Sequence, residues 1–364
     1  MGSQDQDGVH GTVYQYAYTT ADESFKRKYV MLNIYNTFDK VESILLGSVD
    51  KSVIKSCDTK QENRLHDIFD KTSEELDIIQ YVLEKKGVKV YRPGKCNNIE
   101  ITTPYFTSKG LGMPLSPRDN TLIMGDTLIE TSGWRKERIF ESYYYREVFL
   151  ELQAKGAKWI TMPLPRHLPD TSNTGDYYWV PKEDPILDGA AVLRVGRDIF
   201  ISNGGSHSEL GLTWLKTMFP QYRYHTTKKN FTGHMDAHIC VVRPGLLYTE
   251  HDKQVLPPQF ENWDIIKTPS RYDREKMQEH ELIDARIQDD DRDTSLSTNC
   301  LVLDQNTIMM PNHYEHKKDI IEQFNKHKVE IIFVPLTHQY FFGQGITCMT
   351  QELSRQTDGI QDYF

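Results

Sequence analysis

A cysteine near the C-terminal end is the side chain best placed to act as a nucleophile. Cys348 follows a loop that contains Gly343 and Gly345. Glycines let the backbone approach a bound substrate where a Cβ atom would clash. A cysteine nucleophile needs a proton carrier and an orienting group, which often lie far away in the sequence. Taken alone, a cysteine after a glycine-rich turn is more often a small buried apolar residue. The other polar residues therefore decide between these two interpretations.

The segment from Gly233 to His238 offers such a proton carrier. We expect it to enter a hairpin as a strand, which would place His234, Asp236 and His238 on one face. That set fits either a metal site or a general acid–base histidine beside a carboxylate. No HExxH motif or further ligand cluster accompanies it. The pattern thus favours acid–base chemistry at His234 and a structural role for His238, and it predicts neither metal nor cofactor.

Two further acids stand just before predicted hairpins. Asp188 is followed by Gly-Ala-Ala, and Asp119 lies in the segment Ser-Pro-Arg-Asp-Asn. Each is most simply a turn residue. Together with Asp236, however, they make three hairpins that begin beside an acid. Converging carboxylates that face a cysteine indicate a cationic, planar electrophile, and a guanidinium fits because its forked N–H donors pair with carboxylates.

A neighbouring Ser-His-Ser segment does not indicate a serine hydrolase. Ser206, His207 and Ser208 lack the G-x-S-x-G spacing of that class. Ser206 or Ser208 is better explained as the N-cap of a helix that runs through Trp214. Since neither GxxxxGK[ST] nor GxGxxG occurs, no nucleotide is predicted.

The elements that must position these residues recur along the chain. Pairs of short apolar runs split by turn residues predict hairpins at 121–129, 192–201, 239–248 and 301–309, and 41–47 resembles the opening strand of a fifth. A second element, an isolated strand that leads to a proline or polar turn, occurs at 88–93, 158–163, 222–226, 263–269 and 329–335. Most copies follow a stretch with helical apolar spacing, as in 76–83, 144–152 and 320–324, whereas the fourth has only a short candidate helix at 258–262.

Five hairpin–helix–strand units indicate an α/β ring of modules that leaves no exposed sheet edge and has a central channel. The alternative is a two-layer α/β domain whose elements resemble one another by chance. The count of five favours the ring, and strand ends that converge at one end of it would form a natural active site.

Composition sets the broad class of the protein. The 364 residues are 38% hydrophobic and 26% charged, as in ordinary globular proteins, and the net charge of −9 argues against nucleic acid or an anionic membrane as partner. Five widely spaced cysteines without a CxxC motif indicate reduced intracellular thiols. No secretory h-region or apolar run of membrane-spanning length occurs, so we expect a cytoplasmic protein. Residues 1–27 are predicted to form a flexible tail and residues 28–364 a single domain.

Taken together, these segments resemble the glycine amidinotransferase family of the guanidine-modifying pentein superfamily, including amidinotransferases of streptomycin and cyanobacterial toxin biosynthesis. The likeness runs from about Asn36 to the C-terminus. It is carried, in the order of the chain, by 116–119, 125–135, 140–141, 156–163, 188–200, 210–214, 234–236, 296–303 and 345–348. The family fold is a five-bladed α/β propeller, which agrees with the five units counted above.

The resemblance implies a role for seven residues. Cys348 would be the nucleophile, His234 the acid–base and Asp188 its carboxylate partner. Asp119 and Asp236 match positions that hold the guanidinium. Ser297 matches a position near the bound substrate, and Lys253 falls where the family places an arginine for the substrate carboxylate.

Three departures from the family pattern concern the acceptor. Thr347 stands where a histidine is common, Ala191 replaces a second acid, and the segment 352–356 replaces a basic C-terminal tail. Guanidine chemistry is compatible with these changes, but they leave the identity of the acceptor open.

The implied activity is transfer of the amidino group of L-arginine to an acceptor amine. An amidino-cysteine would form, ornithine would leave, and kinetics would be ping-pong. The substrate cation would help to hold Cys348 as a thiolate. An arginine-hydrolysing enzyme, either a deiminase or an ornithine-forming hydrolase, is the alternative within the superfamily. A non-catalytic binding ring is a further alternative, against which the retention of Cys348, His234 and Asp188 argues. No nucleic acid or membrane partner is expected, and a homodimer is left open.

Overall fold

The computed structural model describes residues 32–54, 59–97, 99–108, 110–136, 138–166, 168, 182–228, 231, 233–268, 298–312 and 317–364. The predicted tail 1–27 and Ser297 lie outside the described residues.

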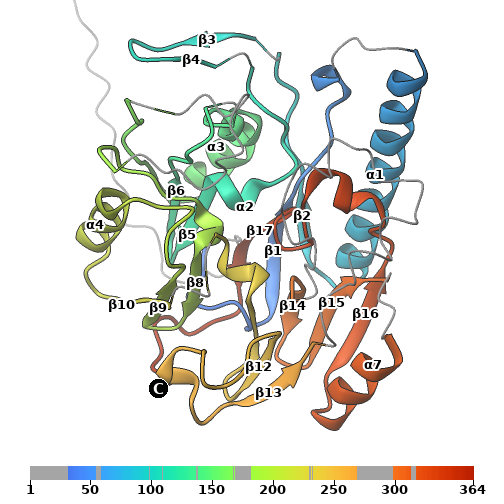
Figure 1. The fold of residues 1–364 in the computed structure, drawn as a ribbon, viewed down its shortest axis with the longest axis vertical. Helices are drawn as coiled ribbons and strands as arrows, with labels where there is room; N and C mark the ends of the chain where they lie inside the picture. The colour runs from blue at the N-terminus through green and yellow to red at the C-terminus, as the bar shows by residue number, and fades with distance from the viewer. Residues whose placement is uncertain are drawn as a thin grey trace, which may run out of the picture.

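Five three-stranded sheets surround a common axis, as the sequence predicts for a five-bladed α/β propeller (Figure 1). In each sheet the central strand pairs antiparallel with one neighbour and parallel with the other. Four sheets begin with a consecutive hairpin. These hairpins are β5 (Thr121–Met124) with β6 (Thr127–Glu130), β8 (Val192–Val195) with β9 (Asp198–Ile201), β11 (Ile239–Arg243) with β12 (Leu246–Thr249), and β14 (Leu301–Asp304) with β15 (Thr307–Pro311).

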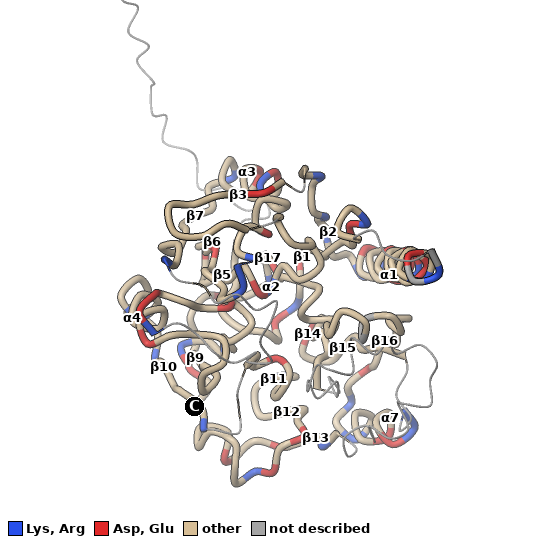
Figure 2. The backbone as a smooth tube through the Cα atoms, turned by 45° about the horizontal axis from the view of Figure 1, so that its top comes forward, with Lys and Arg blue, Asp and Glu red and all other residues tan. Residues whose placement is uncertain are grey.

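The parallel strand of each sheet is the isolated strand that the sequence predicts. These strands are β2 (Lys89–Tyr91), β7 (Lys158–Thr161), β10 (Arg223–Thr226), β13 (Asp264–Lys267) and β16 (Glu330–Val334). A parallel partner requires a crossover connection, and a helical segment supplies it in every unit. These segments are α1 (Thr59–Lys85), α3 (Arg146–Ala154), α4 (Glu209–Met218), the short helix η6 (Pro258–Phe260) and α7 (Lys317–Lys326). Figure 2 shows α1, α3, α4 and α7 on the outside of the ring.

The first sheet closes the ring with the last strand of the chain. Strand β1 (Val41–Leu46) pairs antiparallel with β17 (Thr350–Arg355), so that Leu46 lies opposite Thr350, and it pairs parallel with β2. The first sheet therefore contains strands from both ends of the described chain, which closes the ring of sheets. Cys348 lies two residues before β17, so ring closure fixes its position.

The remaining short elements connect these units. They are the two-stranded sheet of β3 (Ile101–Thr102) and β4 (Thr107–Ser108), the helix α2 (Pro117–Asn120), and the single turns η2 (Lys51–Val53), η3 (Glu141–Tyr145), η4 (Gly189–Ala191), η5 (Met235–Ala237) and η7 (His338–Phe342).

Helix α4 begins where the sequence indicates. The Ser208 hydroxyl accepts a hydrogen bond of 3.0 Å from the backbone N–H of Gly211, which makes Ser208 the N-cap. Ser206 is not the N-cap. Its backbone carbonyl instead accepts a hydrogen bond of 2.8 Å from the backbone N–H of Asp188. The loop before α4 is thus tied to one of the candidate site residues.

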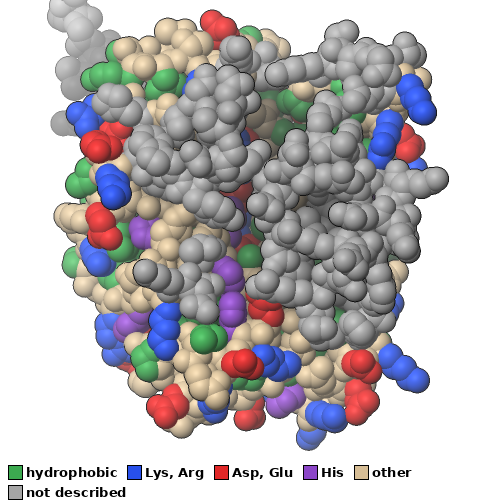
Figure 3. Space-filling view, viewed as in Figure 1, with side chains coloured by type: hydrophobic (Ala, Val, Ile, Leu, Met, Phe, Trp, Pro, Cys, Tyr) green, Lys and Arg blue, Asp and Glu red, His purple; other side chains and the backbone are tan. Residues whose placement is uncertain are grey.

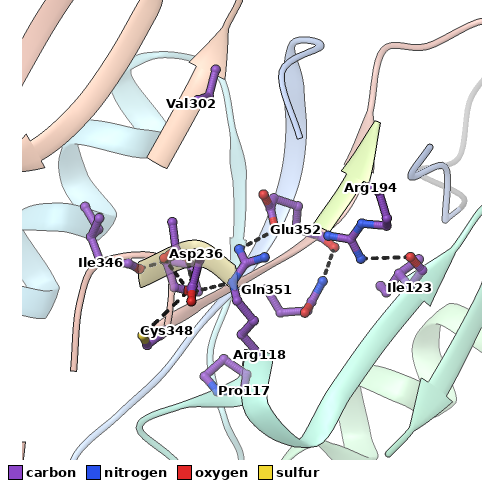
Figure 4. Close-up of polar contacts among 12 residues, drawn as sticks. Pro117, Arg118, Ile123, Arg194, Asp236, Val302, Ile346, Cys348, Gln351 and Glu352 are labelled. Carbon is purple, nitrogen blue, oxygen red and sulfur yellow. Dashed lines mark hydrogen bonds and ion pairs between the residues drawn. The ribbon is translucent and has the colours of Figure 1, made fainter. Parts of the chain in front are cut away.

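Apolar side chains pack between the sheets and the outer helices in four separate clusters, whereas part of the axis is occupied by charge. We call Arg118, Arg194, Glu352 and Arg355 the axial charge cluster; all four side chains are buried. Arg118 lies 2.5 Å from one oxygen of Glu352, and Arg355 lies 2.8 Å from the other. Arg194 donates to the carbonyl of Ile123 at 2.9 Å (Figure 4). A buried carboxylate is tolerated here because both of its oxygens accept charged donors.

Candidate active site

Each three-stranded sheet has polar residues just before one of its edge strands. These edge strands are β5, β8, β11, β14 and β17. Asp119 lies in α2 before β5, Asp188 caps η4 before β8, and His234 caps η5 before β11. Asn299 precedes β14 and Cys348 precedes β17 in the same way. Since the five strands surround one axis, these segments meet at one end of it. In Figure 3 histidine and acidic side chains line a hollow on this face of the molecule.

The prediction that residues 234–238 form a strand is wrong. Met235–Ala237 form a single 3₁₀ turn, closed by a 3.0 Å hydrogen bond from the His238 N–H to the Met235 carbonyl. With three residues per turn, alternate side chains no longer share a face. His234 therefore contacts Asp188 and Asp119, whereas Asp236 contacts Asn299 and Thr347, and both also contact Cys348. His238 is directed to His251, with 3.0 Å between His238 Nδ1 and His251 Nε2.

His234 lies between two of the predicted carboxylates. Its Nε2 is 3.3 Å from Asp188 Oδ2, and its Nδ1 is 3.7 Å from Asp119 Oδ1. Burial opposes the charged imidazolium, but the negative charge of Asp119 and the contacts with Asp188 and Cys348 prevail. They raise the pKa of His234 well above its usual value. The raised pKa favours the protonated ring, which can act as a proton donor.

Asp236 organises the loop of the candidate nucleophile. Its Oδ2 lies 3.7 Å from Cys348 Sγ and accepts hydrogen bonds from Thr347 Oγ1 at 2.6 Å and Asn299 Nδ2 at 3.2 Å. Asn299 Nδ2 also lies 3.4 Å from Cys348 Sγ, and its carbonyl oxygen accepts the Thr347 N–H at 2.8 Å. A Cβ atom on Gly345 would come within 2.2 Å of the Asn299 side chain. Glycine is required at this position because the loop packs directly on Asn299.

Sequence reasoning did not identify Asn299. The available signal was its position before the fifth hairpin-like segment, which matches that of Asp119, Asp188 and Asp236 in their units. Thr347, where the family commonly has histidine, fills a structural role here through its hydrogen bonds to Asp236 and Asn299.

The thiol of Cys348 is protonated in the empty site. Burial, with the charges of Asp236 and Asp119, raises its pKa to about 11, although the hydrogen bond with His234 acts in the opposite direction. A thiolate requires a further positive charge near the sulfur.

Asp119 is held from behind by a buried ionic network that the sequence did not predict. Arg138 donates to Asp119 Oδ2 at 2.8 Å and to Glu141 Oε1 at 2.7 Å. Burial works against the carboxylate, but His234 and Arg138 lower the pKa of Asp119. The carboxylate therefore stays ionised and fixed in one orientation.

Two carboxylate oxygens of the site lack hydrogen-bond donors. The Oδ1 atoms of Asp119 and Asp236 are both buried, and neither has a hydrogen-bond partner among the residues described. A buried, unsatisfied carboxylate oxygen is costly unless a donor arrives with the ligand. The two oxygens suit the N–H groups of a cation.

The axial charge cluster contacts the loop that carries Cys348 through Arg118. Arg118 Nε donates to the carbonyl of Thr347 at 2.6 Å. Figure 4 shows Arg118 between the Asp236–Cys348 pair and Glu352. The buried guanidinium of Arg118 thereby holds the residue before Cys348.

Lys253, the other predicted substrate-binding residue that the structure describes, lies apart from this cluster. Lys253 is exposed in the loop after β12, and within the described ranges no contact joins it to Cys348 or His234. Ser297 is not described. Ala191 lies in η4 and packs in an apolar cluster, so the second acid of the family is replaced by a core residue. No helix in the described part of the chain is long and apolar enough to span a membrane.

No family model matches the sequence. Solved structures nevertheless share the fold. An inosamine-phosphate amidinotransferase of Streptomyces griseus aligns with a TM-score of 0.74 at 25% identity, over 91% of this chain and 99% of that one. An amidinotransferase of the saxitoxin pathway of Microseira wollei gives 0.75 at 23% identity, over 92% and 99%. A dimethylarginine dimethylaminohydrolase gives 0.55 at 14% identity, over 85% and 98%. The protein thus has the fold of the pentein superfamily.

Curated relatives narrow this class. Inosamine-phosphate amidinotransferase 1 of Streptomyces griseus is 27% identical over 354 residues, which cover 89% of this chain and 97% of the relative. The mitochondrial glycine amidinotransferase of Gallus gallus is 26% identical over 374 residues, with 91% and 84% covered. The chain is similar to these amidinotransferases over 89% and 91% of its length, and the activity that the comparisons support is that of an amidinotransferase.

Proposed function

We propose that the protein transfers the amidino group of L-arginine to an acceptor amine through a covalent intermediate on Cys348. The observation that carries the proposal is the convergence on one buried thiol of a protonated histidine and two carboxylates with free oxygens. A guanidinium supplies both the electrophilic carbon and the N–H donors that these groups require.

Substrate binding activates the nucleophile. The guanidinium lies among Asp119, Asp188 and Asp236 and donates to the free Oδ1 atoms of Asp119 and Asp236. These two carboxylates are also the charges that raise the pKa of Cys348 in the empty site. Since the substrate cation neutralises them, the pKa of the thiol falls, the thiol releases its proton to solvent, and the thiolate forms beside the carbon that it attacks.

The first half-reaction releases ornithine. The Cys348 thiolate attacks the central guanidinium carbon and forms a C–S bond. His234, which begins as an imidazolium, donates its proton to the leaving nitrogen, and the C–N bond breaks. Asp188, 3.3 Å from His234 Nε2, keeps the ring oriented during the transfer.

The second half-reaction returns the enzyme to its starting state. His234 is now neutral and takes a proton from the acceptor amine. The amine attacks the amidino carbon, the C–S bond breaks, and the guanidino product leaves; the Cys348 thiolate then takes up a proton from solvent and becomes a thiol again. One imidazole serves both halves, which fits its position between the nucleophile and two acids.

The acceptor is a primary amine whose identity the chain leaves open. Relatives are named for inosamine phosphate and for glycine. Here Thr347 and Ala191 replace family residues at the site. Lys253 and Ser297 remain our candidates for contacts with the distal part of a substrate, and the cytoplasm remains the predicted compartment.

Product analysis tests the proposal. Purified enzyme is incubated with arginine and, separately, glycine, lysine, a diamine or an aminocyclitol phosphate, and products are identified by mass spectrometry. We expect ornithine together with one guanidinylated amine. Citrulline and ammonia as the main products with every amine would instead establish a deiminase, and ornithine with urea would establish a hydrolase.

A further inference from the structure

A second polar cluster lies beside the candidate active site, at the end of the β11–β12 hairpin. Ile239 pairs with Thr249 in this ladder, so His238 stands next to Glu250 and His251. His238 Nδ1 and His251 Nε2 are 3.0 Å apart, and Glu250 Oε1 is 3.8 Å from His251 Nε2. One ligand atom from each residue lies within 4.8 Å of the others, which holds for no other trio of such residues in the described part of the chain.

The two imidazoles are held in place by their surroundings. Thr249 Oγ1 donates to the His238 carbonyl at 2.7 Å and accepts the His251 N–H at 3.1 Å. The fully buried ring of Phe231 packs against His251 at 4.5 Å and against His238 at 5.4 Å between centroids. The geometry of the pair is thus set by the fold.

The chemistry of this trio is that of a transition-metal site. Two imidazole nitrogens and a carboxylate oxygen are a known three-ligand set for zinc that leaves one coordination position open. Zinc–nitrogen bonds of about 2.0–2.1 Å place two tetrahedral nitrogens about 3.3 Å apart, close to the His238–His251 separation. Two facing nitrogens share at most one proton, whereas a metal ion satisfies both lone pairs.

We propose that His238, Glu250 and His251 bind a divalent transition-metal ion of the zinc type at the edge of the active site. The site is separate from the amidino-transfer chemistry and does not depend on it. His238 directly follows η5, the turn that carries Asp236 and begins after His234. The carbonyl of Ala237 in the same turn accepts Thr298 Oγ1 at 2.5 Å. A bound ion therefore fixes the turn from its C-terminal end.

Cobalt(II), used as the probe, tests the proposal in the Cys348→Ala background, which removes the most obvious competing ligand. Isothermal titration should give one equivalent of saturable binding. The visible spectrum should show tetrahedral or five-coordinate cobalt without the strong near-ultraviolet band of a cysteine ligand. Adding His251→Ala should weaken binding at least about 100-fold, and adding Glu250→Gln should weaken it less.

His225→Gln is the matched control. His225 Nε2 also contacts a carboxylate, Asp198 Oδ1, at 2.6 Å, but it lies in a different sheet and forms no three-ligand group with other described residues. This variant should bind cobalt like its parent. Circular dichroism checks that each variant is folded. If His251→Ala does not fold, the cobalt affinity of Glu250→Gln tests the proposal.

Three results would overturn the proposal. They are the absence of saturable binding, binding that neither substitution weakens, and a cysteine-to-cobalt band in the spectrum. In each case His238 and His251 would be a hydrogen-bonded pair and no metal site.

Discussion

We call Asp119, Asp188 and Asp236 the acidic mouth. It lies next to the axial charge cluster; both groups are mostly buried, and they are opposite in charge. The mouth holds Asp119, Asp188 and Asp236 around one histidine, whereas the axis holds three arginines around Glu352. Both oxygens of Glu352 accept guanidinium donors from the protein itself. In the mouth, the Oδ1 atoms of Asp119 and Asp236 have no such donor within the described ranges.

This difference separates stability from function. Arginine–carboxylate pairing is complete at Glu352, and it connects sheets across the ring. In the mouth, Arg138 pairs with one oxygen of Asp119, and pairing of the Oδ1 atoms of Asp119 and Asp236 is left for a ligand; the negative charges of these two carboxylates contribute to the raised pKa of the Cys348 thiol. Substitutions in the mouth should thus reduce activity, and substitutions in the axis should reduce stability.

Loss of the nucleophile should have the largest effect. Cys348→Ala should lower arginine consumption by about 10⁵-fold or more, because no other group forms the covalent intermediate. Thermal unfolding should be near that of the parent. Cys96→Ala serves as control, since the Cys96 thiol lies 3.5 Å from the Tyr143 carbonyl and packs against an apolar cluster that contains none of the candidate site residues. Near-normal activity of Cys348→Ala would rule out the covalent mechanism.

His234→Asn should have the next largest effect, a loss of roughly 10²–10⁴-fold in kcat. Because the imidazole acts first as acid and then as base, both half-reactions should slow. Intact-mass measurement after mixing with arginine should show little adduct on the variant. Rapid and complete adduct formation would restrict His234 to the second step or to a structural role.

Glu352→Gln should act mainly on folding. Removal of one partner from a buried ionic group costs about 3–5 kcal/mol, and denaturant unfolding measures it. Burial opposes ionisation of Glu352, but Arg118 and Arg355 lower its pKa well below the usual value. The depressed pKa contributes stability above the unfolded-state pKa, and this is lost as pH falls towards the folded-state pKa. The acid sensitivity of unfolding should therefore be smaller in the variant than in the parent.

Asp236→Asn provides the opposite half of the comparison. We expect a loss of roughly 10–150-fold in kcat/KM, equivalent to one charged hydrogen bond of about 1.5–3 kcal/mol. Stability should fall less than in Glu352→Gln, since the variant retains a side-chain oxygen that can accept from Thr347 and loses a charge that repels neighbouring carboxylates. A loss of stability as large as that of Glu352→Gln would contradict the separation between mouth and axis.

The smallest expected effect concerns the thiol pKa. In the empty enzyme, the rate of iodoacetamide alkylation at Cys348 should keep rising with pH towards about 11. Methylguanidinium, or Asp236→Asn, should move this profile to lower pH, because each reduces the negative charge near the sulfur. Cys96 measured in the same samples is the control. A profile that neither change moves would contradict substrate-assisted ionisation.

Local patterns in the sequence predicted much of the fold. Apolar runs split by turn residues gave the four hairpins, and the five isolated strands lie where expected. Closure of the ring by β17 was not predicted, because its partner β1 lies at the other end of the chain. The turn at Met235–Ala237 was mistaken for strand because three residues are too few to show a periodicity.

The site was predicted in part for similar reasons. Cys348, His234 and the three aspartates are marked by residue type and by their positions before strands, and the structure brings them together. Asn299 and Arg138 were missed because their importance comes from contacts between sheets. Lys253, inferred from spacing across a loop, lies exposed.

The most direct test of the central claim is a chemical-quench experiment with arginine and no acceptor. Intact-mass analysis and peptide mapping should find an amidino group on the peptide that contains Cys348, with one ornithine released per adduct. Addition of a competent acceptor amine should remove the adduct and yield the guanidino product, and Cys348→Ala should form no adduct. Steady ornithine production without an adduct on any time scale, or an adduct on a different cysteine, would contradict the account.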